Sequence, residues 1–350
     1  MTQLEIAQLL KISPATVSMA LHGTGRISEE LREKILALTR EHHVSIRKRY
    51  ARKDASGAPV KRSTLRLGYC CVYHDIDAWL HAGAYRGMLE PSDATEHEIR
   101  LFSSHLSYSN SPEEIRQDFA RLKERVVAAR LDGLLLDPHQ AFIQEVLNLP
   151  IPKVMLGYYN FFPESLDAVV CDNYAAAYKL TQKLIEQGRR RIALLRCDPE
   201  TPNSREKLSG YMAALRENGI TLQSQWIVES GYQREYGERA AEHLLSLNQP
   251  PDAVVLDNDW MTGHLVNALR ARGRAGHKYL DSLALAHCED ARKDTGLERE
   301  IQRTEIRPDL LGRVALRHLL DRVAGRVAGE PVTIKITPFY RSGGAERIKS

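Results

Sequence analysis

After residue 63 the chain alternates between short apolar segments and longer amphipathic ones. The apolar segments have the length and composition of buried strands; they read LRLGYCCVY, IRLFSS, DGLLLD, PKVMLGY, DAVVCD, RIALLRC, WIVES, DAVVLD and SLALAH. Between them lie helical patterns: EEIRQDFARLKERVVAAR, AAYKLTQKLIEQG, REKLSGYMAALRENG, GERAAEHLLSL and MTGHLVNALRARG. This alternation predicts parallel sheets with helices on both faces. In such sheets ligands bind beyond the carboxyl ends of the strands.

The sequence carries no motif of an enzyme. A dinucleotide fingerprint, a P-loop, a nucleophile elbow and an HExxH pair are all absent. The five cysteines form no CxxC and are odd in number, so neither a zinc site nor a disulfide framework is indicated. The Cys70-Cys71 pair falls in a predicted buried strand, where a structural role is expected. We therefore expect no cofactor, no metal and no catalytic residue.

Length and hydropathy limit the class of protein further. A chain of 350 residues with 43% hydrophobic content has room for two or three domains and a buried core. No run of about 18 apolar residues exists, so no membrane span is expected. The N-terminal MTQLEIAQLLKIS lacks the features of a signal peptide. The expected location is therefore the cytoplasm, without a membrane partner.

Charge is unevenly distributed along the chain. Residues 1–62 hold twelve Lys or Arg against six Asp or Glu, a net charge of +6. Because the whole chain carries +4, the remaining residues carry −2. A basic N-terminal part attached to a slightly acidic remainder indicates a polyanion as partner of the N-terminus.

The N-terminal residues predict three short helices. Thr2 and Glu5 fit a capping box at the start of the first helix. Ser13 is a suitable N-cap for a second helix, with Pro14 at its first position, and Ser28 is a suitable N-cap for a third. Apolar residues expected to face a common core are Leu4, Ala7 and Leu10 in the first helix, Val17, Ala20 and Leu21 in the second, and Leu31, Ile35 and Leu38 in the third.

Two short helices joined by a tight turn, with a third closing the core, form a helix-turn-helix. The exposed face of the second helix holds only small side chains, Ala15, Thr16 and Ser18, so that helix can approach a partner closely. The alternative is a minor helical bundle in which the short helix only packs. The proline, the small face and the basic flank together favour insertion into the major groove of DNA.

This stretch, LEIAQLLKISPATVSMALHGTGRISEELREKILALTREH, resembles the DNA-binding domain of the lac repressor family of bacterial transcriptional regulators. The resemblance implies that Pro14, Ala15 and Met19 read bases, and that Ser13, Thr16, Ser18 and His22 lie at phosphates or nearby groove positions. Met19 and His22 depart from the common Arg and Asn. Met19 cannot make a bidentate contact with guanine, but it can touch a thymine methyl group, which implies an atypical operator.

A basic linker follows the helices over residues 46–63. In the family this segment forms a hinge helix that inserts a leucine into the minor groove. Here no leucine stands at the matching place, and Tyr50 is the candidate substitute. We expect Arg47, Arg49 and Arg52 to contact DNA phosphates. The alternative is that the segment is a solvated tether.

The resemblance extends over almost the whole chain. VVCDNYAAAYKLTQKLIEQGRRRIALL, PDAVVLDNDWMTGHLVNALRARG and the final RPDLLGRVALRHLLDRV with PFYRSGGA are similar to segments of the family's core. The implied fold class is an all-α helix-turn-helix domain followed by an α/β periplasmic-binding-protein-like core of two lobes, joined by three crossovers and forming a homodimer. The expected domains are residues 1–45, the linker, and a core over 64–342. Lobe one is expected at about 64–167 plus 304–326, and lobe two at about 168–303 plus 327–342.

The resemblance also implies an effector site between the lobes. The residues carried over to it by position are Tyr73, Asp75, Trp79, Arg205, Lys207, Tyr232, Asn258, Asp259, Cys288 and Glu289. Lys207 stands where the family has an Arg, and Cys288 where it has an Asp that binds sugar hydroxyls. Some of these residues have a structural alternative. Tyr73 and Tyr232 can be aromatics at the edge of the core, Arg205 can be the partner in a surface ion pair, and Asp75 can cap the following helix.

Together these features predict a sequence-specific DNA-binding transcription regulator, a repressor, whose affinity for a near-palindromic operator changes when a small molecule such as a sugar binds the core. Two other classes of protein are the alternatives. A solute-binding protein for transport would explain the core but not the N-terminal helices. An α/β enzyme would need a catalytic motif. An activator, or a regulator without a ligand, stays open within the first interpretation.

Overall fold

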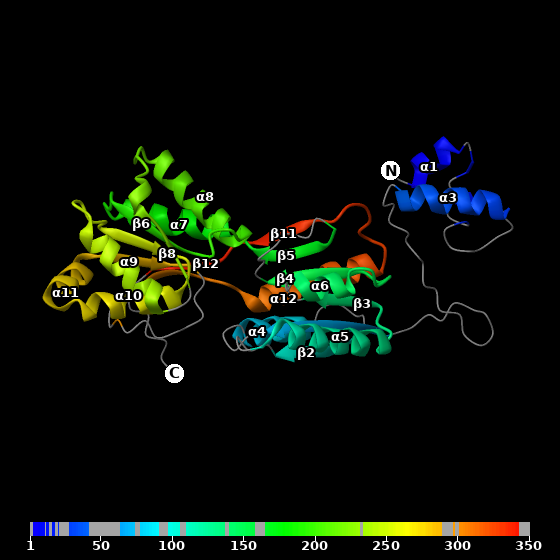
Figure 1. Ribbon diagram of the computed structural model, residues 1–350. Helices are drawn as coiled ribbons and strands as arrows, with labels where there is room; N and C mark the ends of the chain where they lie inside the picture. Colours follow the sequence, from blue (N-terminus) through cyan, green and yellow to red (C-terminus); the bar gives the residue numbers. More distant parts are fainter. Residues whose placement is uncertain are drawn as a thin grey trace. The chain divides into compact units, whose positions relative to one another are not determined.

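The computed structural model divides into two compact units, residues 1–63 and 64–350, which are described separately. Figure 1 shows the helices and strands of both. The residues that the structure describes are 3–10, 12–13, 16–17, 20, 28–41, 64–73, 78–90, 97–105, 110–136, 140–157, 165–231, 234–288, 297 and 301–342. Within these residues no helix is both long and apolar enough to span a bilayer.

The N-terminal unit contains helices α1 (Gln3–Leu9) and α3 (Glu29–Glu41), with Thr16, Val17 and Ala20 also helical between them. Its core consists of the fully buried Ile6, Ala7, Val17, Ala20 and Ile35. Leu10, Leu31 and Leu38 pack against this cluster. The inward faces predicted from helical spacing are confirmed at all of these positions, whereas Leu4 and Leu21 lie outside the side chains described.

The second unit contains two six-stranded sheets, each with helices on both faces. The first sheet has the order β11-β5-β4-β3-β1-β2 and the second β12-β10-β9-β8-β6-β7, and all pairs are parallel except β10 with β12. The strands of the first sheet are β1 (Leu65–Tyr73), β2 (His97–His105), β3 (Gly133–Leu136), β4 (Lys153–Gly157), β5 (Asp167–Cys171) and β11 (Thr333–Ile336). Those of the second are β6 (Ile192–Cys197), β7 (Ile227–Ser230), β8 (Ala253–Leu256), β9 (Ala284–His287), β10 (Gln302–Glu305) and β12 (Phe339–Arg341).

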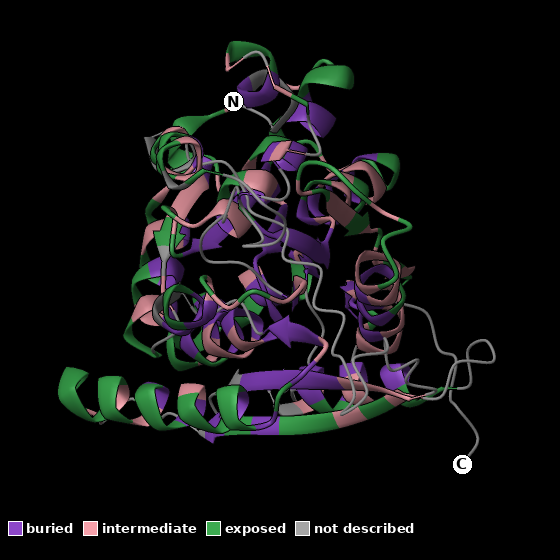
Figure 2. Cartoon of the chain, turned by 90° about the vertical axis from the view of Figure 1, so that its right-hand side faces the viewer, coloured by how far each residue is buried: buried purple, intermediate pink, exposed green. Residues whose placement is uncertain are grey.

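The first sheet is covered by α5 (Pro112–Ala128) and α6 (Gln140–Val146) on one face, and by α4 (Ala78–Leu89) and α12 (Pro308–Val323) on the other. The second is covered by α7 (Asn173–Glu186) and α8 (Pro202–Glu217) on one face, and by α9 (Arg234–Ser246), α10 (Asp259–Ala271) and α11 (Gly273–Ser282) on the other. In Figure 2 the strands are largely purple, whereas the helices turn green outward faces to solvent. The predicted α/β fold class is confirmed.

The chain passes between the two sheets three times, after Cys171, after Glu305 and after Ile336. This agrees with the three crossovers that were expected, but the exchange points differ from the lobe boundaries drawn from sequence. Strands β5 and β11 belong to the first sheet, because β5 pairs with β4 and β11 pairs with β5. The last two residues of β10, Thr304 and Glu305, belong to the second sheet through the pairing of their strand with β9 and β12.

Helices α4 and α12 cross at glycines. A Cβ atom on Gly312 would lie 2.0 Å from the carbonyl oxygen of Ala84, and one on Gly87 would lie 1.9 Å from that of Asp309. Backbone cannot yield as a flexible side chain can, so these two positions accept only glycine at this interhelical distance. The close crossing fixes α12, which follows the second crossover, against lobe one.

One partly buried cation, Lys153, makes stability depend on pH. Lys153 opens β4 and donates to the carbonyl oxygens of Leu149 and Ile151, at 2.5 and 2.9 Å. Burial nevertheless lowers the pKa of Lys153 to about 8. The unfolded chain therefore binds more protons than the folded one between pH 8 and 10, and stability rises with pH in this range.

Between pH 7 and pH 9 we expect the free energy of unfolding of the core to rise by about 1 kcal/mol more in the wild type than in a Lys153→Met variant, which lacks the partly buried ammonium. Urea titrations of both proteins at the two pH values measure the difference. Parallel pH dependence in wild type and variant would show that Lys153 keeps its ordinary pKa.

Candidate nucleic-acid interface and effector site

Ser13 caps the second N-terminal helix as predicted. Its hydroxyl oxygen accepts the backbone N–H of Thr16 at 3.0 Å and lies 2.9 Å from the Thr16 hydroxyl. Its carbonyl oxygen accepts the N–H groups of Thr16 and Val17, which begins the helical hydrogen bonding. Because Val17 is fully buried, the cap connects the start of this helix directly to the core of the N-terminal unit.

Of the predicted DNA contacts, only Ser13 and Thr16 belong to the part of the chain that the structure describes. The others, which stay predictions, are Pro14, Ala15, Ser18, Met19, His22, Arg47, Arg49, Tyr50 and Arg52. Ser13 is exposed and Thr16 is half-buried, so both can reach a partner.

A Ser13→Ala variant should lose about 1 kcal/mol of stability in the N-terminal unit, since it removes the side-chain acceptor of the Thr16 amide and leaves only the Ser13 carbonyl. Operator affinity should fall severalfold, because the helix start is less ordered. Thermal unfolding followed by circular dichroism and operator titration measure the two effects. Ser13→Asp, which retains a capping oxygen, is the control and should retain stability.

In the second unit a buried ion pair lies at the carboxyl ends of β6 and β8. The Lys207 ammonium donates to the backbone carbonyl of Asp257 at 3.1 Å and lies 4.0 Å from carboxylate Oδ1, and both side chains are 4% exposed. The other carboxylate oxygen of Asp257 accepts the backbone N–H of Cys197 at 2.7 Å. Burial raises the pKa of the Asp257 carboxyl, although Lys207 and the Cys197 amide act in the opposite direction.

A second cation at this edge also has internal partners. Arg196 is buried; its Nε donates to the Ser204 hydroxyl at 3.2 Å, and its guanidinium donates to the Pro199 carbonyl at 2.9 Å. Glu229 lies 3.9 Å away on the neighbouring strand β7. Lys207 and Arg196 are thus both engaged with partners inside the protein.

The turn between β8 and α10 is organised by Asn258. Its side-chain oxygen accepts the N–H of Met261 at 2.9 Å and caps α10. Its carbonyl accepts the Thr262 hydroxyl at 3.2 Å, and that hydroxyl lies 3.2 Å from Nδ1 of His287 at the end of β9. The neighbouring Asp259 is 1% exposed. Polar groups from the ends of β8 and β9 are therefore connected through α10 at the edge where α/β sheets bind ligands.

A cavity of about 530 Å³ lies between elements of the two lobes. Its lining comprises Trp79, Gly83 and Arg86 of α4, residues 305–309 of the second crossover, and Phe339 and Arg341 of β12. Arg341 donates to Glu305 at 3.1 Å and lies over the Phe339 ring. The volume is within the range of about 300–1,000 Å³ of small-molecule sites. It adjoins the crossovers, so its shape depends on how the lobes are joined.

The predicted effector residues fall into three groups. Trp79 is half-buried and lines this cavity, and Asn258 and Asp259 lie at the strand ends of the second sheet. Lys207 and Cys288 are buried, the first beside Asp257 and the second in an apolar cluster, and Arg205 is exposed on α8. Asp75, Tyr232, Glu289 and the side chain of Tyr73 lie outside the described residues. Effector contact by any of them stays a prediction.

Asp257 and Arg196 were missed by sequence reasoning. Asp257 precedes Asn258 directly, in VVLDND, so an acidic residue at a strand end was a readable signal. Arg196 lies within an apolar strand, where a lone charge indicates a buried partner. Neither signal identifies the partner of the charged residue, because Lys207, the partner of Asp257, and Glu229, the partner of Arg196, lie on other elements.

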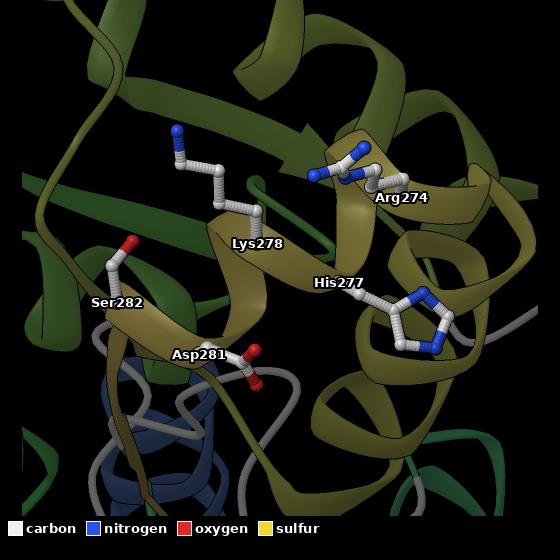
Figure 3. A pocket seen from close by; sticks show the side chains of 5 residues that line it. All are labelled: Arg274, His277, Lys278, Asp281 and Ser282. Atoms are coloured by element: carbon white, nitrogen blue, oxygen red, sulfur yellow. The ribbon is translucent and has the colours of Figure 1, made fainter.

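A second hollow, of about 500 Å³, lies on the outer surface of α11. Figure 3 shows its lining side chains, Arg274, His277, Lys278, Asp281 and Ser282, all from this one helix and spread apart from one another. All five are exposed. They do not enclose a ligand. Among the described residues, no group of three His, Cys, Asp or Glu side chains could hold a metal ion.

Family comparison assigns both units. Residues 2–43 match the model for bacterial regulatory proteins of the lacI family, and residues 93–342 match that for periplasmic binding proteins and the sugar binding domain of the LacI family. The second match spans well over half of the chain. The chain belongs to the LacI family. This LacI-family protein is a DNA-binding transcription regulator with a ligand-binding core, and not an enzyme.

Similar proteins include two named repressors. The HTH-type transcriptional repressor CytR of Escherichia coli strain K12 is 29% identical over 333 residues, which cover 94% of this chain and 91% of CytR. The HTH-type transcriptional repressor PurR of Escherichia coli O1:K1 is 25% identical over 340 residues, which cover 95% and 93%.

Solved structures share the fold. A complex of the transcriptional regulator CelR with cellobiose has a TM-score of 0.64 at 22% identity, covering 97% of this chain and 98% of CelR. A LacI-family regulator from Enterococcus faecium with bound ribose has a TM-score of 0.58 at 15% identity, covering 79% and 97%.

Proposed function

We propose that this LacI-family protein is a homodimeric repressor in the cytoplasm. The second helix of each N-terminal unit enters the major groove at one half-site of a near-palindromic operator. A small uncharged metabolite, such as a sugar, binds between the lobes of the core and changes operator affinity. The observation that carries the proposal is the capped helix-turn-helix domain joined to a core whose chain crosses three times between its two sheets.

The three crossovers support a coupling between ligand binding in the core and affinity for the operator. A ligand shifts a conformational equilibrium only by its differential affinity for the two states. A ligand that contacts both lobes binds the two states with different affinity, because its contacts depend on how the lobes are positioned relative to each other. Similarity to CytR and PurR, both named as repressors, supports repression over activation. The structures with cellobiose and ribose support a sugar as the first class to test.

The test is selection of bound sequences from a random duplex pool with the full-length protein. The recovered duplex is then titrated by fluorescence anisotropy at several salt concentrations. We expect a near-palindrome, bound with an affinity that falls steeply with salt because phosphate contacts release counterions. Cellobiose, ribose and a panel of nucleosides are then added to the complex, and release or tightening identifies the effector class. Failure to enrich any sequence, with or without the panel, would overturn the proposal.

A further inference from the structure

We infer that Lys207 is a positioning residue and that its ion pair with Asp257 holds the strand ends which carry the Asn258–Asp259 turn. The family resemblance implies a ligand contact for position 207. In this chain the ammonium instead donates to the Asp257 carbonyl at 3.1 Å and lies 4.0 Å from its carboxylate. The relevance of the turn to a ligand rests on the proposed function, whereas the positioning itself does not.

The geometry around Asp257 brings three elements together. One carboxylate oxygen faces Lys207 of α8, and the other accepts the Cys197 amide at the end of β6 at 2.7 Å. The Asp257 amide in turn donates to the Leu195 carbonyl of β6 at 3.1 Å, so this residue is bonded to β6 through both backbone and side chain. Immediately after it, Asn258 caps α10 through the Met261 amide.

Burial makes the pair interdependent. Both side chains are 4% exposed, so either charge without the other would lie in a region of low dielectric. Removing both charges together is tolerated far better than removing one, because a neutral pair has no comparable desolvation penalty. A pair with this role therefore has a distinct signature: the effects of the two single substitutions are strongly non-additive.

The experiment is hydrogen–deuterium exchange of the full-length protein, followed by mass spectrometry, on K207M, D257N and the double variant. We expect each single substitution to speed exchange by at least about tenfold in peptides that contain the amides of Cys197 and Met261. The charge-assisted bond from the Cys197 amide to Asp257 is lost or weakened, and the Asn258 cap that accepts the Met261 amide is held less firmly. Peptides of α5 in lobe one should be unchanged. The double variant should exchange more slowly in these peptides than either single variant.

Arg216→Met is the matched control on the same helix, because Arg216 is exposed. It should leave every peptide unchanged. Equal acceleration across both lobes in the single variants, or additive effects in the double variant, would overturn the positioning role. The measurement uses neither DNA nor effector, so failure of the proposed function would leave its result intact, and failure here would leave the operator selection intact.

Discussion

Removal of residues 1–62 is expected to lower operator affinity by at least about a thousandfold while leaving the core folded. Specific recognition exceeds non-specific binding by roughly 10³ or more, and the truncated chain loses the helix-turn-helix together with the basic linker. The remaining residues carry a net charge of −2, so they have no electrostatic attraction to the duplex. Both sheets and all four of their apolar clusters lie beyond residue 63.

Anisotropy titration of the selected operator measures the loss, and thermal unfolding by circular dichroism reports on the core. The unfolding midpoint of the truncated protein should stay within a few degrees of the core transition of the full-length chain. A second variant that lacks residues 1–45 retains the linker, so comparison of the two truncations gives the linker's contribution to DNA affinity. We expect it to bind duplexes without sequence preference and with a shallower salt dependence than the full-length protein. Tight, sequence-specific binding by either truncation would contradict the assignment of DNA reading to the helices.

The sequence predicted those elements whose residues carry a local pattern. All nine apolar segments are strands, and the five helical patterns correspond to α5, α7, α8, α9 and α10. The helices α4, α6 and α11 and the strands β10 and β11 were not recognised. Strand β10 reads QRTE and β11 reads TIKI, so their polar residues hide them from a search for apolar runs. Their identity as strands comes from pairing with neighbours distant in sequence.

Sheet membership could not be predicted from residues, for a related reason. Strand β5 is buried at every position, which is compatible with either sheet. Its place is decided by the register with β4, in which Met155 pairs with Ala168. A boundary at residue 168 therefore divided a strand that the fold keeps whole in lobe one. The partner of Lys207 could not be predicted either. The position of Lys207 in the chain indicated a contact with a ligand, whereas in the structure it donates to Asp257, which lies 50 residues further along the chain.

An Asp167→Ala substitution should destabilise the core by about 3–5 kcal/mol, because it leaves a buried guanidinium without its carboxylate. Asp167 opens β5 and is 8% exposed, and its Oδ1 accepts Arg322 Nη2 of α12 at 2.6 Å. The same oxygen accepts the Val332 amide at 2.8 Å just before β11. His318 Nε2 lies 3.3 Å away. One carboxylate oxygen thus connects α12 to β5, which precedes the first crossover, and to β11, which precedes the third.

The expected loss distinguishes this buried cluster from surface ion pairs. Glu238→Ala removes an exposed partner of Arg234 on α9, where the two side chains lie 3.1 Å apart, and should change stability by no more than about 0.5 kcal/mol. Urea unfolding of the isolated core measures both variants against wild type. Asp167→Asn retains an acceptor for the Val332 amide but not the charge, so its loss should fall between the two. A loss in Asp167→Ala as small as that in Glu238→Ala would contradict this role. The junction of β5, β11 and α12 would then depend on apolar packing alone, in which Leu311, Ala315 and Leu319 hold α12 against the sheet.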